Sequence, residues 1–489
     1  MMTVFLIFFP LFLALVLFAL RPSNARSWAL AGSLIELIGS LVVAIGFSPA
    51  QSYQYVVDVP WVSSLGLHFA VGIDGIGLVL VLLTTVLVPL IILSSFNSSY
   101  PNPPTFYGLI LIMQMALIGV FTALDGLLFY LFWEVALIPI YFICHIWGGE
   151  DRGRITLKFF IYTLAGSLFM LVGLVYLYYQ TPAPHTFDID ALYQAGRSLP
   201  QEAQGLIFWA MFVAFAIKMP VFPFHTWQPD TYTVAPVQGT MLLSGIMLKM
   251  GIYGMIRWLI PVVPAGVHAW GSTAIVLSII GIIYASCIAI IQKDFKRLIA
   301  YSSIAHVGLI SAGALTLSTI GVQGAMIQMF SHGIIVFALF YIIEIIFERI
   351  KSRNLADLGG IRNVAPTLTT TFMIVMLGSV ALPLTSGFIG EFLLINSLFQ
   401  YQALMGAISG LTIILGAVYM LRTFQQSMSG ETKVTARFAD LTNHEKLVLY
   451  PVVILILLLG VYPMPLLKIS EASVESLLTI YSNMSALGK

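Results

Sequence analysis

Long apolar runs, separated by short polar segments, fill the chain from end to end. A membrane-spanning helix needs about 20 mostly apolar residues to cross the hydrocarbon core. The sequence contains 14 such runs, near residues 3–20, 28–47, 76–95, 107–124, 126–147, 156–179, 206–226, 236–260, 270–291, 298–317, 322–347, 368–399, 403–424 and 447–467. The pattern predicts an all-α polytopic membrane protein with about 14 transmembrane helices.

Prolines interrupt two of these runs. Pro220 and Pro223 cut the seventh run, and Pro383 lies inside the twelfth, which is too long for one straight span. Broken helices at corresponding positions of two halves are typical of transporters built from inverted repeats. Helices 7 and 12 are five helices apart, so we predict two inverted five-helix repeats. The predicted parts are N-terminal helices 1–3 (residues 1–100), a first repeat of helices 4–8 (residues 105–260), a second repeat of helices 9–13 (residues 268–425), and helix 14 with the C-terminal tail (residues 426–489).

The composition excludes several classes of protein. The chain is 59% hydrophobic and 9% charged, whereas an ordinary soluble domain is about 25% charged. Its 22 Lys and Arg residues against 21 Asp and Glu leave no basic excess for nucleic acid. Two distant cysteines, Cys144 and Cys287, cannot ligate an iron–sulfur cluster, and no nucleotide-binding motif occurs. We therefore expect this chain to bind no cofactor and no metal.

The basic residues divide unevenly between the two sides of the predicted helices. Sixteen lie in loops on one side: Arg21, Arg26, Arg152, Arg154, Lys158, Lys293, Lys296, Arg297, Arg349, Lys351, Arg353, Arg362, Arg422, Lys433, Arg437 and Lys446. Four lie on the other side: Arg197, Arg257, Lys468 and Lys489. Because cytoplasmic loops are rich in Lys and Arg, this bias predicts both termini on the outer side.

Four charged residues lie deep inside the apolar runs: Glu134, Lys218, Lys249 and Glu391. A charge at the centre of a membrane helix costs about 2.5–3.5 kcal/mol, so such residues are candidates for function. The alternative is a set of structural ion pairs or polar contacts between helices. Two of the four lie close to a predicted helix break, which favours a path for ions or protons.

Two histidines, His306 and His332, also lie deep in the tenth and eleventh runs. An isolated membrane histidine is commonly a hydrogen-bond partner between helices. These two fall between Lys249 and Glu391 in the chain, and an unperturbed pKa near 6.5 suits histidine to relay protons. Both interpretations remain open from the sequence.

Several motifs resemble those of one known family. The segments are AIKMPVFPFHTWQPD (216–230), LKMG (248–251), FWEVALIP (132–139), AYSSIAHVG (300–308) and GFIGEF (387–392). Together they resemble the antiporter-like subunits of proton-pumping NADH:quinone oxidoreductase, respiratory complex I, over about residues 70–425. Glutamate at position 391 resembles the M-type members, the counterparts of mitochondrial subunit four, because the N- and L-type members usually carry lysine there.

The resemblance implies a role for each buried residue. Glu134 is expected to pair with Lys218, Lys249 to link two half-channels, and Glu391 to be the exit-side proton site. His306 and His332 match positions on the central polar axis of the family.

The resemblance also implies partners and a location. NADH, flavin, iron–sulfur clusters and quinone are expected in partner subunits, and other antiporter-like subunits are expected to flank this chain on both sides. The location implied is a bacterial inner membrane. Two alternatives remain open: a subunit of a multi-subunit Na⁺/H⁺ antiporter, and the membrane arm of an energy-converting hydrogenase.

Overall fold

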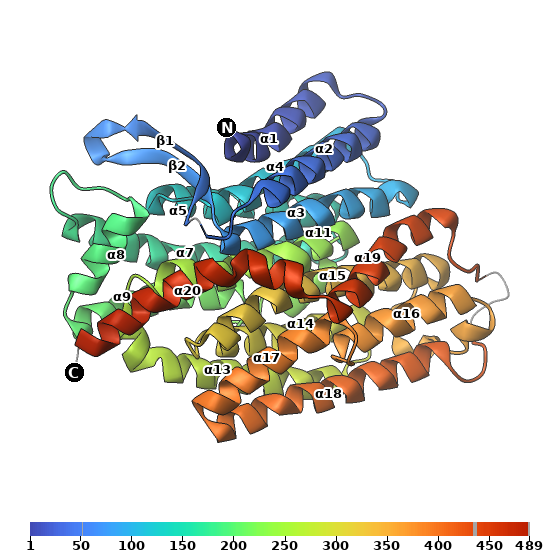
Figure 1. Ribbon diagram of the computed structural model, residues 1–489. Helices are drawn as coiled ribbons and strands as arrows, with labels where there is room; N and C mark the ends of the chain where they lie inside the picture. The colour runs from blue at the N-terminus through green and yellow to red at the C-terminus, as the bar shows by residue number, and fades with distance from the viewer. Residues whose placement is uncertain (51, 434–437, 488–489) are drawn as a thin grey trace.

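The computed structural model describes residues 1–50, 52–433 and 438–487; Arg437 and Lys489, two of the cations assigned to a side above, lie outside them. The helices form one bundle with similar axis directions (Figure 1). They are α1 (Met2–Leu20), α2 (Ala25–Gly46), α3 (Gly75–Ser94), α4 (Pro103–Thr122), α5 (Gly126–Val135), α6 (Leu137–Trp147), α7 (Arg152–Gln180), α8 (Ile189–Ser198), α9 (Gln201–Lys218), α10 (Gln228–Val234), α11 (Val237–Leu242), α12 (Leu248–Gly254), α13 (Pro264–Ile291), α14 (Phe295–Ala314), α15 (Thr319–Ile350), α16 (Pro366–Ser379), α17 (Ser386–Tyr401), α18 (Ala403–Met428), α19 (Asn443–Val461) and α20 (Met464–Leu487).

The bundle has the character expected of an integral membrane protein. Within the described residues, 11 helical segments are long and apolar enough to cross a membrane. The segment Val237–Leu259 is completely buried, whereas only 33% of the most apolar stretch of α1, 39% of that of α7 and 33% of that of α18 is buried. The count of 14 spans and the repeat boundaries stay predictions.

The two predicted helix breaks are confirmed. In the seventh segment α9 ends at Lys218 and α10 begins at Gln228, with Pro220 and Pro223 between them. In the twelfth, α16 ends at Ser379 and α17 begins at Ser386, with Pro383 between them. Proline has no N–H and its ring crowds the preceding turn, so it cannot continue a helix.

Two further irregularities were not predicted from the sequence. The fifth segment divides at Ala136 into α5 and α6. The eighth contains two π-helical turns, η3 (Leu243–Met247) and η4 (Met255–Leu259), on either side of α12. Such turns change the backbone hydrogen-bond pattern and frequently occur at functional sites.

The all-α prediction missed a two-stranded hairpin. Strands β1 (Gln54–Val62) and β2 (Leu67–Ile73) pair antiparallel, with Val57 opposite Val71. Together with α8 it lies at one end of the bundle, which we call the hairpin face, and both ends of the chain point toward this face (Figure 1).

The prediction for the C-terminal part was also incomplete. The run 447–467 is not one helix, because α19 ends at Val461 and α20 begins at Met464. Pro463, which lacks the N–H needed to continue a helix, lies between them. The tail is therefore a second helix, α20, which packs along α3 and α15 and crosses the front of the bundle in Figure 1.

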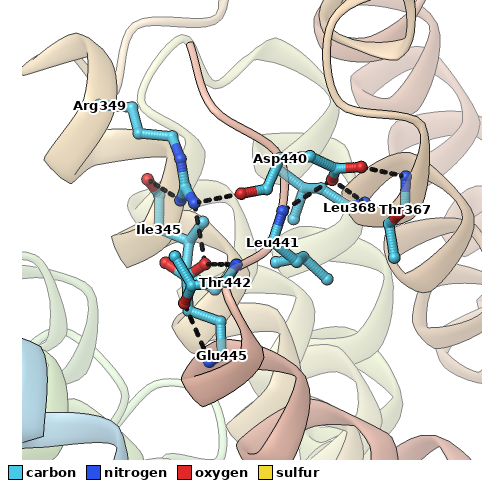
Figure 2. A network of polar contacts seen from close by, with 8 residues as sticks. All are labelled: Ile345, Arg349, Thr367, Leu368, Asp440, Leu441, Thr442 and Glu445. Carbon is cyan, nitrogen blue, oxygen red and sulfur yellow. Dashed lines mark hydrogen bonds and ion pairs between the residues drawn. The ribbon is translucent and has the colours of Figure 1, made fainter.

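A polar network joins three helix ends on the face opposite the hairpin (Figure 2). Arg349, near the end of α15, binds the Glu445 carboxylate of α19 at 2.8 Å and the Asp440 carbonyl at 3.1 Å. The Asp440 carboxylate accepts hydrogen bonds from the amides of Thr367 and Leu368, in the first turn of α16, each at 2.9 Å. Burial by itself would raise the pKa of Asp440, but these hydrogen bonds outweigh it and hold the pKa below its usual value.

Candidate functional site

The six residues predicted from the sequence all lie inside the bundle, and three of them, Glu134, Lys218 and Lys249, lie beside a helix irregularity. Lys218, Lys249, Glu391, His306 and His332 are buried. Glu134 is half-buried and precedes the α5–α6 division by two residues. Helix breaks at membrane depth are tolerated where protein or a water-filled cavity surrounds the freed backbone groups. The helix breaks thus place free backbone polar groups near charged side chains inside an otherwise apolar bundle.

Lys249 occupies the centre of this arrangement. It lies in α12 directly after the π turn η3, and its Nζ donates to the Ser244 carbonyl of that turn at 2.6 Å. The same Nζ lies 2.9 Å from Nδ1 of His332 on α15. The lysine of the first predicted repeat is therefore in direct contact with a histidine of the second.

Polar contacts continue from His332 into the second repeat. Nε2 of His332 lies 3.1 Å from the Ser303 hydroxyl, and its ring centroid lies 6.0 Å from that of His306. Nδ1 of His306 lies 2.8 Å from Oε1 of Glu391. The two groups are at ion-pair distance, but the ring nitrogen is not aligned for a hydrogen bond.

A small cavity lies among these groups. Its volume is about 10 Å³, and its lining includes His306, His332, Glu391 and Gln328. Nε2 of Gln328 donates to Oε1 of Glu391 at 3.2 Å. A polar cavity of roughly 10–15 Å³ is the smallest that holds a water molecule. The space between the two histidines and the glutamate is therefore just sufficient for one bridging water.

Glu134 and Lys218 are arranged differently. The structure contains no ion pair within 4.0 Å between these two described residues, although each lies within electrostatic range of the other. Nζ of Lys218 instead faces the ring of Trp133, 5.2 Å from its centroid. The direct pairing of Glu134 with Lys218 stays a prediction.

The end of α9 explains why a lysine is tolerated at position 218. Lys218 is the last residue of this helix, where unpaired carbonyls give a partial negative charge that favours a cation. Nε1 of Trp227 donates to the Ile217 carbonyl at 2.9 Å, so the break itself is capped from the loop that follows. The FHTWQPD part of the motif thus has a local structural role.

Sequence reasoning missed one buried charge pair. Arg257, assigned to an outer loop, lies instead in the π turn η4 and forms an ion pair with Asp74, the N-cap of α3. Both side chains are buried. The signal was present, because Arg257 lies inside the run 236–260 and follows Lys249 by eight residues. Lys296, also assigned to a loop, is likewise buried, and its Nζ donates to the Ala235 carbonyl at 2.7 Å.

The family model described as "NADH:quinone oxidoreductase/Mrp antiporter, TM" matches residues 123–416, more than half of the chain. The chain belongs to this family. The match contains all six predicted site residues, and it confirms the resemblance drawn from the sequence motifs.

Individual members of the NADH:quinone oxidoreductase/Mrp antiporter family support a closer assignment. The chain is 41% identical over 461 residues to NADH-quinone oxidoreductase subunit M of Rickettsia conorii, covering 94% of this chain and 93% of the relative. It is 36% identical over 493 residues to F(420)H(2) dehydrogenase subunit M of Methanosarcina mazei, covering 98% of each chain. A chain in the structure of respiratory complex I from Thermus thermophilus with bound NADH matches with a TM-score of 0.88 and 28% identity, covering 98% of this chain and 100% of that one.

Proposed function

We propose that this chain is the membrane-arm, M-type proton-translocating subunit of an NADH:quinone oxidoreductase. The observation that carries the proposal is the line of neighbouring buried polar residues from Lys249 through His332 and His306 to Glu391. Buried ionisable residues in contact across helices are the expected form of a proton relay in a membrane. The similarity to the subunit M relatives supports the same assignment.

The chemistry that drives translocation would lie in other subunits. NADH, flavin, iron–sulfur clusters and quinone are assigned to partner subunits, and this chain is assigned no redox centre. We place other antiporter-like subunits on both sides of it. We place it in a bacterial inner membrane with the hairpin face outside, as supported by the uneven distribution of basic residues.

The first repeat would control the charge on Lys218. Two unit charges 4 Å apart interact by about 4 kcal/mol at an effective dielectric constant of 20, equivalent to roughly three pKa units. Bringing Glu134 into contact with Lys218 would favour a protonated lysine, and separating them would favour release of its proton. In the structure Nζ of Lys218 faces the ring of Trp133 and forms no ion pair with Glu134, which corresponds to the separated arrangement.

The second repeat would then carry the proton onward. Nζ of Lys249 lies 2.9 Å from Nδ1 of His332, so a proton leaving the lysine would pass to this ring nitrogen when the nitrogen carries no proton. His306 and a water molecule in the small cavity would pass the proton to Glu391. From Glu391 the proton would leave on the outer side. Each step needs only small movements of side chains, because the groups already lie close together.

The test places Glu134→Gln and Lys218→Ala separately into the assembled complex. We expect both variants to lose most NADH-driven proton pumping, and turnover with quinone to fall with it, since the two processes are coupled. Lys158→Ala is the matched control, because Lys158 is a partly exposed lysine of α7 that pairs with Asp230 at 3.1 Å. Full turnover and full pumping in both test variants would overturn the assigned roles.

The subunits that copurify with the chain test the type of complex. Peripheral subunits carrying flavin and iron–sulfur clusters are expected. A small assembly of membrane subunits alone would indicate the Na⁺/H⁺ antiporter instead. A nickel–iron partner would indicate the energy-converting hydrogenase.

A further inference from the structure

A polar cavity opens on the hairpin face, away from the relay described above. Its volume is about 310 Å³, and its walls come from the chain before β1, the start of α3, α8, the end of the eighth segment, and α20. The polar lining residues are Tyr53, Asp74, Asp190, Tyr193, Arg257 and Ser473, together with Ser52 and Ser476. At this size the cavity holds several water molecules.

Three polar residues lie along the eighth segment from this cavity to the relay lysine. Lys249, Tyr253 and Arg257 follow each other at intervals of four residues, which brings them onto one face of the eighth segment. Eight residues of helix span about 12 Å. The Tyr253 hydroxyl donates to the Phe121 carbonyl at 3.2 Å. The relay lysine and the outer cavity are thus separated by only two side chains along this line.

Arg257 lies at the inner wall of the cavity and is held from several directions. It forms the buried ion pair with Asp74, and the ring of Tyr53 lies 5.2 Å from its guanidinium carbon. The Tyr193 hydroxyl donates to the backbone carbonyl of Arg257 at 2.6 Å. Asp74 is fixed in turn, because its Oδ1 accepts from the Gly77 amide at 2.8 Å.

The chemistry of this pair opposes proton transfer. A guanidinium group stays protonated in proteins, so it neither takes up nor passes on a proton. Its fixed positive charge also repels an approaching proton, in the way that an arginine excludes cations from selective pores. Asp74, the carboxylate nearest to the line, is occupied by the arginine.

We propose that the Arg257–Asp74 pair is a proton seal, which separates the water-accessible cavity on the hairpin face from Lys249. Without the pair, protons driven back by the membrane potential would reach Lys249 through Tyr253 and re-enter the relay. This inference rests on the proposed function, because it assigns proton transfer to Lys249.

The test measures passive proton leakage through the assembled complex in proteoliposomes, with an imposed pH gradient and no NADH. We expect Arg257→Gln to raise the leak roughly tenfold, the effect of removing a unit charge about 10 Å away at an effective dielectric constant near 20. This variant also frees Asp74 to accept protons. The double variant Arg257→Gln, Asp74→Asn avoids an unpaired buried carboxylate, and we expect it to assemble and to leak by a smaller factor.

Two further variants separate a seal from a structural contact. Arg257→Lys keeps a positive charge but, unlike a guanidinium, can release its proton, so it should leak less than Arg257→Gln and more than wild type. Arg197→Gln is the matched control, since this partly exposed arginine of α8 donates to the Pro261 carbonyl at 3.0 Å but does not line the cavity. Assembled Arg257→Gln and double-variant complexes that hold the gradient as well as wild type would overturn the seal. Equal leakage in Arg257→Lys and Arg257→Gln would also overturn it, because lost packing would then be the cause.

The route through Lys249 has its own check. Adding Lys249→Met to Arg257→Gln should remove the extra leak, and a leak that persists would overturn this route. Leakage without NADH tests the seal, whereas pumping by the Glu134 and Lys218 variants tests the proposed function. The failure of one is therefore distinguishable from the failure of the other.

Discussion

The two predicted repeats hold their buried charges in different ways. In the first, Glu134 and Lys218 interact across space without a direct ion pair, and an indole ring faces the lysine. In the second, direct contacts connect Lys249, His332 and Ser303 and bring His306 against Glu391. A separated charge pair can be brought into contact or kept apart, and its Coulomb energy changes with that distance. A chain of contacting groups instead conducts without large movement, so the first region is suited to control and the second to transfer.

Lys249→Met should have the largest effect, since Lys249 is the contact between the two regions. Its removal leaves His332 without the amine that lies 2.9 Å from it. We expect pumping per complex to fall by about a hundredfold or more, the usual scale for loss of a proton-transfer group. The measurement is NADH-driven acidification of inverted membrane vesicles. Lys293→Met is the control, because Lys293 is exposed near the start of α14; pumping by Lys249→Met at the level of this control would refute the link.

Glu391→Gln should have the next largest effect, because it removes the ionisable group at the far end of the proposed relay. The amide keeps the size of the side chain and a hydrogen bond to Gln328, but it loses the charge that faces His306. We expect pumping to fall roughly three- to tenfold, with partial recovery in Glu391→Asp. If Glu391→Gln pumps normally, the transfer path does not end at this residue.

The histidines should show smaller individual effects and strong coupling. A water molecule can bridge the space left by one missing ring, so His306→Ala and His332→Ala should each lower pumping by about twofold. The double variant should lose more than the product of the two single effects, because the groups belong to one chain of contacts. A double-mutant cycle on pumping rates measures this, and simple multiplication of the single effects would argue against a shared relay.

Asp440→Asn should have the smallest effect on transport and mainly lower stability. It weakens the anchor at the start of α16, the first part of the broken helix that carries Glu391 (Figure 2). Loss of hydrogen bonds to a charged group costs about 1–3 kcal/mol.

The pH dependence of Tm shows whether the Asp440 carboxylate provides this stability. The pKa of Asp440 is lower in the folded protein than in an unfolded chain, so the contribution of its carboxylate is complete above the unfolded pKa. It is lost as the pH falls through the folded pKa, below about pH 4. The difference in Tm between wild type and Asp440→Asn should therefore be constant near neutral pH and shrink in acid. A difference that does not change with pH would show that packing, and not charge, is responsible.

The sequence was sufficient where a single segment carries the signal. Long apolar runs identify membrane helices because an α-helix forms all its backbone hydrogen bonds within one segment. The only other regular structure that satisfies these groups in lipid is a closed β-barrel. Prolines located the breaks beside Lys218 and before Glu391, because proline removes a backbone donor. Charges inside apolar runs identified the candidate site, because burying a charge in a membrane is costly.

Signals that depend on another segment were missed. The π turns beside Lys249 have no characteristic amino-acid composition. The hairpin β1–β2 has only two strands, and such a hairpin is only marginally stable unless it packs against other elements. The pairing of Arg257 with Asp74 was missed because Asp74 lies far away in the chain and only folding brings the two residues together.

The sequence by itself therefore determined that the chain is a helical membrane protein of one family, which charged residues to consider as candidates inside the apolar runs, and where two helices break. Only the tertiary structure decided which of these residues touch. It placed Lys249 against His332 and His306 against Glu391, left Glu134 apart from Lys218, and paired Arg257 with Asp74. The physical reason is that the cost of a buried charge is a property of one residue, whereas its compensation depends on distances between segments remote in the chain.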